Sequence, residues 1–258
     1  MRPARAGAVL LAALAVLSAG GCSSQNTKKP AEELLNERMA SVLLHDGRWL
    51  DAERAYRDCA KTDPKNPNVN DGLGVALFYQ GKVKESIEWF DKAVKYGPEM
   101  ALYRIHRGMA RTQAGDYKAA EEDFQAASAS ATPDDQLDLS LQRGRLKQLE
   151  GDSRGSEAYY NDALSRDPRN FTGLLGRGIS RESQGHMDLA AQDYLEAVKV
   201  QPKNPDGNLR LGLALVALDR QNLGRRYLER TVELDPSGDA GSRARVALDS
   251  LGPEARKK

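Results

Sequence analysis

Few side chains in this 258-residue chain have the type and spacing that catalysis or metal binding requires. The histidines, His45, His106 and His186, stand far apart and lack the i, i+4 spacing by which a helix presents two metal ligands. Serine is plentiful, but the sequence contains no nucleophile elbow, no glycine-rich phosphate loop and no cysteine with a nearby histidine. We therefore expect no catalytic residue, no metal, no cofactor and no small-molecule substrate.

Cys22 differs from these residues because it directly follows an apolar segment. Arg2 and Arg5 precede an apolar run over residues 7–19, and polar residues begin at Ser23. A membrane-spanning helix needs about 20 apolar residues, so this run is too short to be retained as one. A basic start, a short apolar run and small residues at its end are typical of a secretory signal peptide. The sequence therefore predicts a signal peptide over residues 1–21.

The residues around Cys22 suggest a chemical modification. The stretch Ala19-Gly20-Gly21-Cys22 resembles the bacterial lipobox, in which cleavage occurs before the cysteine and its sulfur carries a diacylglycerol. Ala19 departs from the leucine that is usual there, and a conventional signal peptide with a cysteine nearby by chance remains the alternative. Ser23 is not the aspartate that retains enteric lipoproteins in the inner membrane. The resemblance thus implies lipidation at Cys22, a tether over residues 22–30, and an outer-membrane location on the periplasmic face.

The mature chain is nearly neutral. Without Arg2 and Arg5, 36 basic side chains face 37 acidic ones, for a net charge of −1. This balance provides no electrostatic footprint for nucleic acid. Cys59 would have no disulfide partner once Cys22 is acylated, so an exported chain of this kind must be held together by its core.

A repeat of about 34 residues becomes visible when prolines and glycines are aligned. Prolines recur at 64, 98, 168, 202 and 236, with Pro133 one place late for the missing member. Glycines stand 17 or 18 residues ahead of the first five of these marks, at Gly47, Gly81, Gly115, Gly151 and Gly185. A period of 34 with a glycine near the middle and a proline at the end is typical of tetratricopeptide repeats.

The residues between these marks fit a helical hairpin in which small positions face large ones. Small residues recur at Ala40, Gly74, Gly108, Gly144, Gly178 and Gly212, and large ones at Tyr56, Phe90, Phe124, Tyr160, Tyr194 and Leu228. A second small position recurs at Cys59, Ala93, Ala127, Ala163, Ala197 and Thr231. Cys59 is therefore expected to be a buried packing residue rather than a reactive thiol.

On these motifs the chain resembles proteins with six tetratricopeptide repeats, which would cover residues 33 to 236. The resemblance implies an all-α fold, a right-handed superhelical solenoid of six helix-turn-helix repeats. The last unit is atypical, with Asp219 in place of the turn glycine, as terminal repeats often are. Residues 239–251 are expected to form a capping helix, so the repeat domain with its cap spans 31–252 and a tail follows at 253–258.

Arginines one residue before the packing glycines allow two interpretations. Arg107, Arg143 and Arg177 could form an anion-binding ladder. Asp123 and Asp193, however, stand 16 residues after Arg107 and Arg177, on the facing helix of the same hairpin. We expect Arg–Asp pairing within each repeat.

The first helix of each repeat carries a second apolar stripe that its hairpin partner does not explain. By resemblance to tetratricopeptide superhelices these positions would line a concave groove, although some are expected to pack against a neighbouring repeat instead. A lysine-rich clamp for a terminal carboxylate is absent, since Glu37 and Ser41 stand in its place. An apolar groove suits an amphipathic helix or strand of a protein partner. The predicted groove residues are Val75, Phe78, Tyr79, Leu102, Ile105, Met109, Leu141, Leu175, Ile179, Leu209, Leu213 and Val216.

A lipidated cysteine followed by six repeats in about 250 residues resembles the type IV pilus pilotins of the PilF, PilW and Tgl kind. That resemblance implies an outer-membrane adaptor that binds secretin subunits and promotes their localisation and multimer assembly. Two other adaptors fit the same plan, a Tad pilus assembly lipoprotein and an NlpI-like scaffold for peptidoglycan hydrolases. An enzyme is disfavoured because no catalytic constellation is present.

Overall fold

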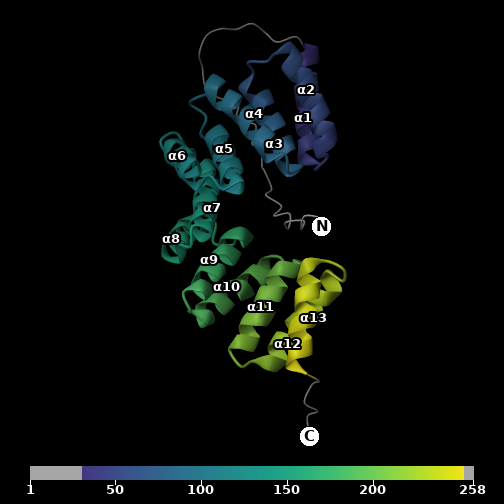
Figure 1. Cartoon of the computed structure of the whole chain (residues 1–258), viewed down its shortest axis with the longest axis vertical. Helices are drawn as coiled ribbons and strands as arrows, with labels where there is room; N and C mark the ends of the chain where they lie inside the picture. Colours follow the sequence, from purple (N-terminus) through teal and green to yellow (C-terminus); the bar gives the residue numbers. More distant parts are fainter. Residues whose placement is uncertain (1–30, 253–258) are drawn as a thin grey trace. The chain divides into compact units, whose positions relative to one another are not determined.

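The computed structural model of the chain describes residues 31–252, with side chains described from Leu34 onward (Figure 1). The predicted signal peptide, Cys22, the tether and the tail 253–258 lie outside the described residues. Between residues 31 and 252 the chain forms thirteen α-helices and no strand. They are α1 (Ala31–His45), α2 (Trp49–Thr62), α3 (Pro67–Tyr79), α4 (Val83–Tyr96), α5 (Ala101–Ala114), α6 (Tyr117–Ser128), α7 (Pro133–Leu149), α8 (Ser153–Arg166), α9 (Phe171–Ser183), α10 (Met187–Val200), α11 (Pro205–Ala217), α12 (Gln221–Leu234) and α13 (Asp239–Leu251).

The helices pair in chain order into six hairpins. Contacts join α1 with α2, α5 with α6, α7 with α8, α9 with α10, and α11 with α12. In the remaining hairpin, Gly74 of α3 faces Phe90 of α4. The chain divides into two compact units between Ala93 and Val94, within α4. We call the part up to Ala93 unit 1 and the part from Val94 unit 2.

Each hairpin turns where the backbone enters the left-handed region. The five turn glycines anticipated from the repeat have φ between 70° and 84°, and they are Gly47, Gly81, Gly115, Gly151 and Gly185. Glycine adopts this conformation without a steric cost, because it has no Cβ. In the sixth hairpin Asp219 takes the same place with φ of 60°, a conformation that aspartate tolerates better than most residues. The repeat spacing therefore located every turn.

Polar side chains start many of the helices. Asn170 and Asn204 precede α9 and α11, and each side chain accepts a hydrogen bond from the backbone N–H three residues ahead. Asp116 and Asp152 do the same at the starts of α6 and α8. These caps satisfy backbone donors that a helix cannot pair internally.

The predicted contacts between small and large residues are confirmed. A Cβ added to Gly108 would lie 2.5 Å from Cε1 of Phe124, so the aromatic ring rests directly on the glycine backbone. The same relation joins the other four glycines of this position to their partners: Gly74 to Phe90, Gly144 to Tyr160, Gly178 to Tyr194 and Gly212 to Leu228. Close approach of the two helices in each of these hairpins therefore depends on the missing side chain.

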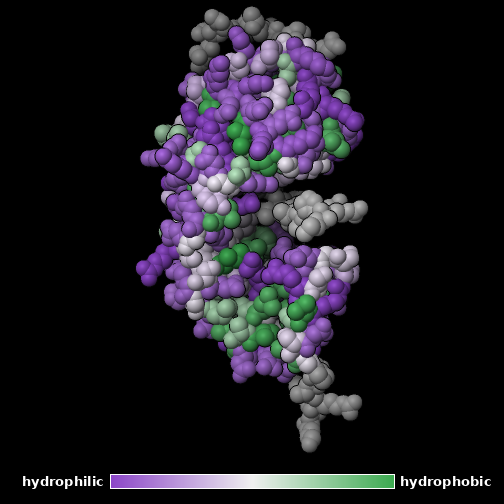
Figure 2. Space-filling model, viewed as in Figure 1, coloured by the Kyte–Doolittle hydropathy of each residue, from purple (hydrophilic) through white to green (hydrophobic). Residues whose placement is uncertain are grey.

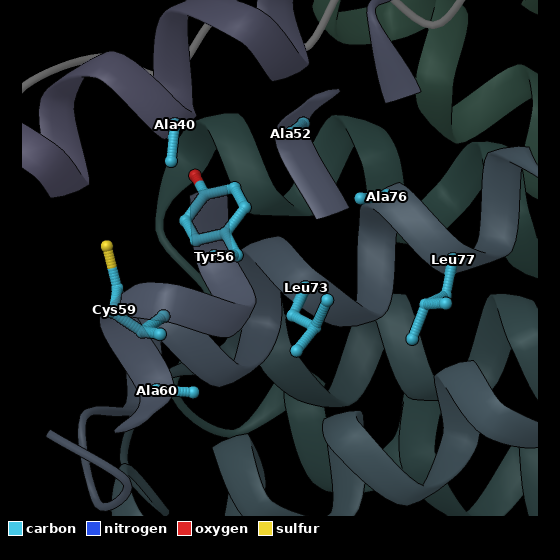
Figure 3. Close-up of a cluster of buried hydrophobic side chains, with 9 residues drawn as sticks. Ala40, Ala52, Tyr56, Cys59, Ala60, Leu73, Ala76 and Leu77 are labelled. Carbon is cyan, nitrogen blue, oxygen red and sulfur yellow. The ribbon is translucent and has the colours of Figure 1, made fainter. Parts of the chain in front are cut away.

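The core of unit 1 gathers side chains from three helices (Figure 3). Ala40 of α1, Tyr56 and Cys59 of α2, and Leu73 of α3 belong to one buried cluster. Cys59 is 8% exposed, which agrees with its predicted role as a packing residue.

At the C-terminal end of unit 2, α13 covers the last hairpin. It contacts both α12 and α11, and it buries Ala240 and Ala244 against Leu209 and Leu228. The all-α fold of helical hairpins with a final capping helix is thus confirmed. Among residues 31–252, no helix has the length and apolar character needed to cross a bilayer.

Candidate protein-binding surfaces

The arginines near the packing glycines are engaged in ion pairs. Arg107 Nη2 lies 2.6 Å from Asp123 Oδ1, and Arg111 Nη1 lies 3.0 Å from Asp123 Oδ2. The side chain of Asp123 is only 3% exposed. The predicted pairing of Arg107 with Asp123 is therefore confirmed, and a buried carboxylate with two guanidinium groups is well compensated.

The same arrangement recurs two repeats later. Arg177 Nη2 and Arg181 Nη1 lie 2.7 Å and 2.8 Å from the carboxylate of Asp193, as predicted for Arg177. Arg177 also donates to Asn161 Oδ1 at 2.9 Å. These contacts occupy the guanidinium N–H groups that a bound anion would need as hydrogen-bond donors.

Arg143, the third arginine of the suggested ladder, has no aspartate at the matching position. Its guanidinium lies 4.6 Å from the ring centre of Tyr159, and it forms an ion pair with Glu121. The alternative of an anion-binding ladder is therefore not supported at any of its three positions.

A polar cluster around Glu53 was missed by the sequence analysis. The carboxylate of Glu53 accepts hydrogen bonds from Gln80 Nε2 at 2.7 Å, from Lys82 Nζ at 2.8 Å and from Arg57 Nη2 at 2.8 Å. Burial opposes the charge of Glu53, but these donors outweigh it and lower the pKa of the carboxyl to about 2. The cluster joins α2 to the end of α3 and the turn that follows it.

Unit 2 contains a second cluster of this kind. Glu157 accepts from Gln184 Nε2 and from Arg181 Nε, both at 2.8 Å. Burial again opposes the charge, and these donors lower the pKa of Glu157. In both clusters the glutamate lies on the second helix of one hairpin. The glutamine follows it by 27 residues, at the end of the first helix of the next hairpin. That spacing is the sequence signal by which the clusters could have been found.

Three of the twelve predicted groove residues are corrected by the structure. Ile105 and Leu209 are 1% exposed and Leu141 is 3% exposed, so none of them can contact a partner. Ile105 packs with Phe124 in the core of the third hairpin. Leu141 likewise packs with Tyr160 of α8, and Leu209 packs with Leu228 of α12. The second helix of the same hairpin therefore covers these three residues, which the sequence analysis had placed outside the contact between the two helices.

In unit 1 the predicted groove residues belong to a partly exposed aromatic cluster. Phe78 and Tyr79 lie at the end of α3 beside Val75, and all three are half-buried. The ring of Tyr79 stacks on Trp49 of α2 with 4.4 Å between ring centres, and Phe78 meets Tyr79 edge-on at 5.5 Å. Rigid aromatic side chains with one open face are typical anchors for a protein partner. Trp49 was not identified from the sequence.

In unit 2 the remaining predicted groove residues are also half-buried. Five of the six pack against the core: Met109 contacts the cluster around Phe124, Leu175 and Ile179 the cluster around Tyr194, and Leu213 and Val216 the cluster around Leu228. The partly exposed residues of this set are Leu102, Met109, Leu175, Ile179, Leu213 and Val216.

A shallow hollow of about 460 Å³ lies between α11 and α13. Leu213, a predicted groove residue, lines it together with five residues of α13: Ser242, Arg243, Val246, Ala247 and Ser250. Val246 is 70% exposed, and apolar side chains gather over this part of unit 2 in Figure 2. We call this site the C-terminal hollow. The sequence analysis treated α13 only as a cap and did not anticipate its contribution.

No cluster of histidine, cysteine, aspartate or glutamate suited to hold a metal ion occurs in the part of the chain that the structure describes.

Comparison with known proteins identifies the repeat. The model of the tetratricopeptide repeat matches residues 38–101, 90–135, 141–208 and 175–239. The chain belongs to the tetratricopeptide-repeat family. Tetratricopeptide arrays are generally scaffolds without catalytic activity, and they bind protein partners.

Two solved structures resemble this tetratricopeptide array over nearly their whole length. PilW, described as a widely conserved type IV pilus biogenesis factor, superposes with a TM-score of 0.74 and 16% identity, covering 85% of this chain and 99% of PilW. PilF of Pseudomonas aeruginosa superposes with a TM-score of 0.71 and 14% identity, covering 84% of this chain and 97% of PilF. At these identities the likeness shows the fold.

Curated relatives share only a region with this chain. It is 24% identical over 170 residues to the probable UDP-N-acetylglucosamine–peptide N-acetylglucosaminyltransferase SPINDLY of Hordeum vulgare, covering 64% of this chain and 18% of that protein. The chain spans between 12% and 33% of the lengths of the curated relatives it matches.

Proposed function

We propose that this protein is an outer-membrane lipoprotein adaptor of the pilotin type, which binds secretin subunits and promotes their assembly into multimers for type IV pilus biogenesis. The proposal combines an anchor at Cys22 with a tetratricopeptide scaffold that presents apolar surfaces to a protein partner. It assigns no catalytic role to any residue.

The observation that carries the proposal is the exposed apolar lining of the C-terminal hollow. Val246 keeps 70% of its surface open, and Leu213 and Ala247 continue the apolar lining beside it. Contiguous apolar surface that stays open on a folded protein, unlike a single exposed side chain, marks a site for a protein partner. The aromatic cluster of Trp49, Phe78 and Tyr79 provides a second surface of the same character.

Secretin subunits are partners of suitable chemistry. A subunit that has not yet joined its ring exposes apolar strand edges, which favour aggregation. An adaptor held at the membrane would cover part of that surface and raise the local concentration of subunits where the ring forms. The likeness to PilW and PilF over nearly their entire length supports this choice among pilus and envelope adaptors.

The anchor and the partner can be tested in one experiment. Cells fed labelled palmitate are extracted with detergent, and the protein is purified by affinity. We expect the wild type to carry the label and to bring down secretin subunits, and we expect Cys22→Ala to lose the label and to leave the membrane fraction. A wild-type protein that stays in the membrane without label contradicts the lipoprotein assignment, and a purified protein without secretin contradicts the pilotin assignment.

A further inference from the structure

The first helix of the array exposes an apolar stripe. Leu35, Met39 and Val42 of α1 are 59%, 59% and 58% exposed. Their spacing of i, i+4 and i+7 places them on one face of the helix. Leu50 of α2 is exposed to the same degree, at 60%, but it does not share a helix face with other exposed apolar side chains as these three residues of α1 do.

The register of the repeat explains what this face is. The residues 34 positions later in the sequence are Val69, Leu73 and Ala76 of α3, which are 1%, 0% and 0% exposed. In α3 these side chains are buried because α2, the last helix of the preceding hairpin, packs on them. The stripe on α1 is therefore the surface on which one hairpin normally receives the previous one, and no described helix precedes α1.

The segments that flank the described residues are largely polar. Residues 22–30 read CSSQNTKKP and residues 253–258 read PEARKK, so neither segment carries the apolar side chains that would fill the stripe. A second copy of the chain is not favoured either, because three side chains on one helix fall well short of the roughly 1,200 Å² that a stable protein interface buries. An apolar phase close to α1 would cover the stripe without the need for a large protein interface.

We propose that this face of α1 rests on the lipid bilayer to which the chain is anchored. The inference rests on the proposed lipid anchor at Cys22. The nine residues from Cys22 to Pro30 span at most about 30 Å when extended, so α1 is the described helix that the chain holds nearest to the membrane. Within that distance the acyl region is the nearest apolar environment.

The charges around the stripe are mixed. Arg38 is exposed on α1, and Lys28 and Lys29 precede the helix, but Glu32 and Glu33 lie in its first turn. Basic residues beside an apolar helix face favour anionic headgroups and acidic ones oppose them, so the apolar stripe and the anchor carry the inference. Glu37 is turned elsewhere, since its carboxylate accepts a hydrogen bond from Asn66 Nδ2 at 3.3 Å. Contact of α1 with headgroups would fix the orientation of unit 1 at the membrane, which the tether alone would leave free.

The test uses the mature chain, residues 22–258, carrying Cys22→Ala so that no acyl chain contributes. Its binding to vesicles of phosphatidylethanolamine and phosphatidylglycerol is measured by co-sedimentation. We expect weak binding that falls at least about tenfold when Leu35, Met39 and Val42 are all changed to serine. The matched control changes Leu189, Leu195 and Leu223 of unit 2 to serine, and these three are 41%, 37% and 42% exposed. The control should bind as the parent does, and circular dichroism checks that both variants remain helical.

Several results overturn the inference. Absence of vesicle binding by the parent, or equal loss in the α1 variant and the control, excludes a membrane contact at this face. A parent that is dimeric in solution and becomes monomeric in the α1 variant shows that a second copy covers the stripe. If the α1 variant recovers less secretin but binds vesicles as the parent does, a protein partner covers the stripe. The lipid anchor is tested separately, by palmitate labelling of the wild type in cells. Its absence would not change how the unacylated chain binds vesicles.

Discussion

Glycines inside the helices of this chain differ in whether the surrounding structure has room for a side chain. At Gly108 an added Cβ would lie 2.5 Å from the ring of Phe124, so the position has no room for a side chain. At Gly207 of α11 the nearest atom, on Phe171, would lie 3.4 Å away, which is an ordinary contact. The first glycine permits packing, whereas the second only adds freedom to the unfolded chain.

These two positions give opposite predictions for the same substitution. Gly108→Ala should lower the free energy of unfolding by about 1 to 3 kcal/mol, because the rings and backbone must shift to admit the methyl group. Gly207→Ala should leave the free energy of unfolding unchanged or raise it by up to about 1 kcal/mol. Urea unfolding of both variants measures the difference. Equal destabilisation by the two changes would contradict the assignment of Gly108 as a contact point between helices.

Residue types and spacing could predict these packing contacts but not the exposure of every apolar stripe. Gly108 and Phe124 were paired because a small and a large residue recur 16 positions apart in six units. Ile105 was assigned to a groove although it is buried against Phe124, because the helical spacing did not show that it faces the second helix of its own hairpin. Val246 was overlooked because its helix has no counterpart in the repeat. Periodicity predicts contacts that recur, and it does not predict contacts made only at an end.

Elements of unit 1 are joined by the Glu53 cluster. Glu53 lies on α2, and its partners Gln80 and Lys82 lie at the end of α3 and in the turn before α4. Lys82 belongs to a turn, and its ammonium group donates a hydrogen bond to this buried carboxylate. The 34-residue period could not predict the cluster, because it does not recur in the next repeat. The residues 34 positions after Glu53 and Gln80 are Ile87 and Ala114.

The cluster makes stability depend on pH in an acidic window. The pKa of Glu53 is lowered from 4.5 to about 2, so the carboxylate stabilises the folded protein above pH 4.5 and loses this contribution as the pH falls from 4.5 through about 2. The loss should be on the order of 2 to 3 kcal/mol. Urea unfolding of Glu53→Gln should show less pH dependence across that window than the wild type. Glu88→Gln, at an exposed position of α4, serves as the control, and an unchanged slope in Glu53→Gln would contradict the role of the cluster.

At the scale of the whole molecule, the proposed function requires the anchor and the apolar surfaces to act together. Cys22 would hold the chain at the outer membrane, and the C-terminal hollow would receive the partner. The class of fold could be predicted from the sequence, because a repeat is a local pattern that recurs. The anchor stays a prediction. The binding surface could be predicted only in part, because Leu213 and Val246 come together through the packing of α13 on α11.

The most direct test of the central claim is the amount of heat-resistant secretin multimer in a strain that lacks this gene. We predict that secretin remains present but largely monomeric, and that the wild-type gene restores the multimer. Val246→Asp should fail to restore it while the protein remains folded and in the membrane, because a carboxylate in the hollow would be desolvated without a partner when secretin binds. Leu223→Asp, at an exposed leucine of α12 outside the hollow, should restore it fully. Normal levels of heat-resistant multimer in the deletion strain would contradict the pilotin account.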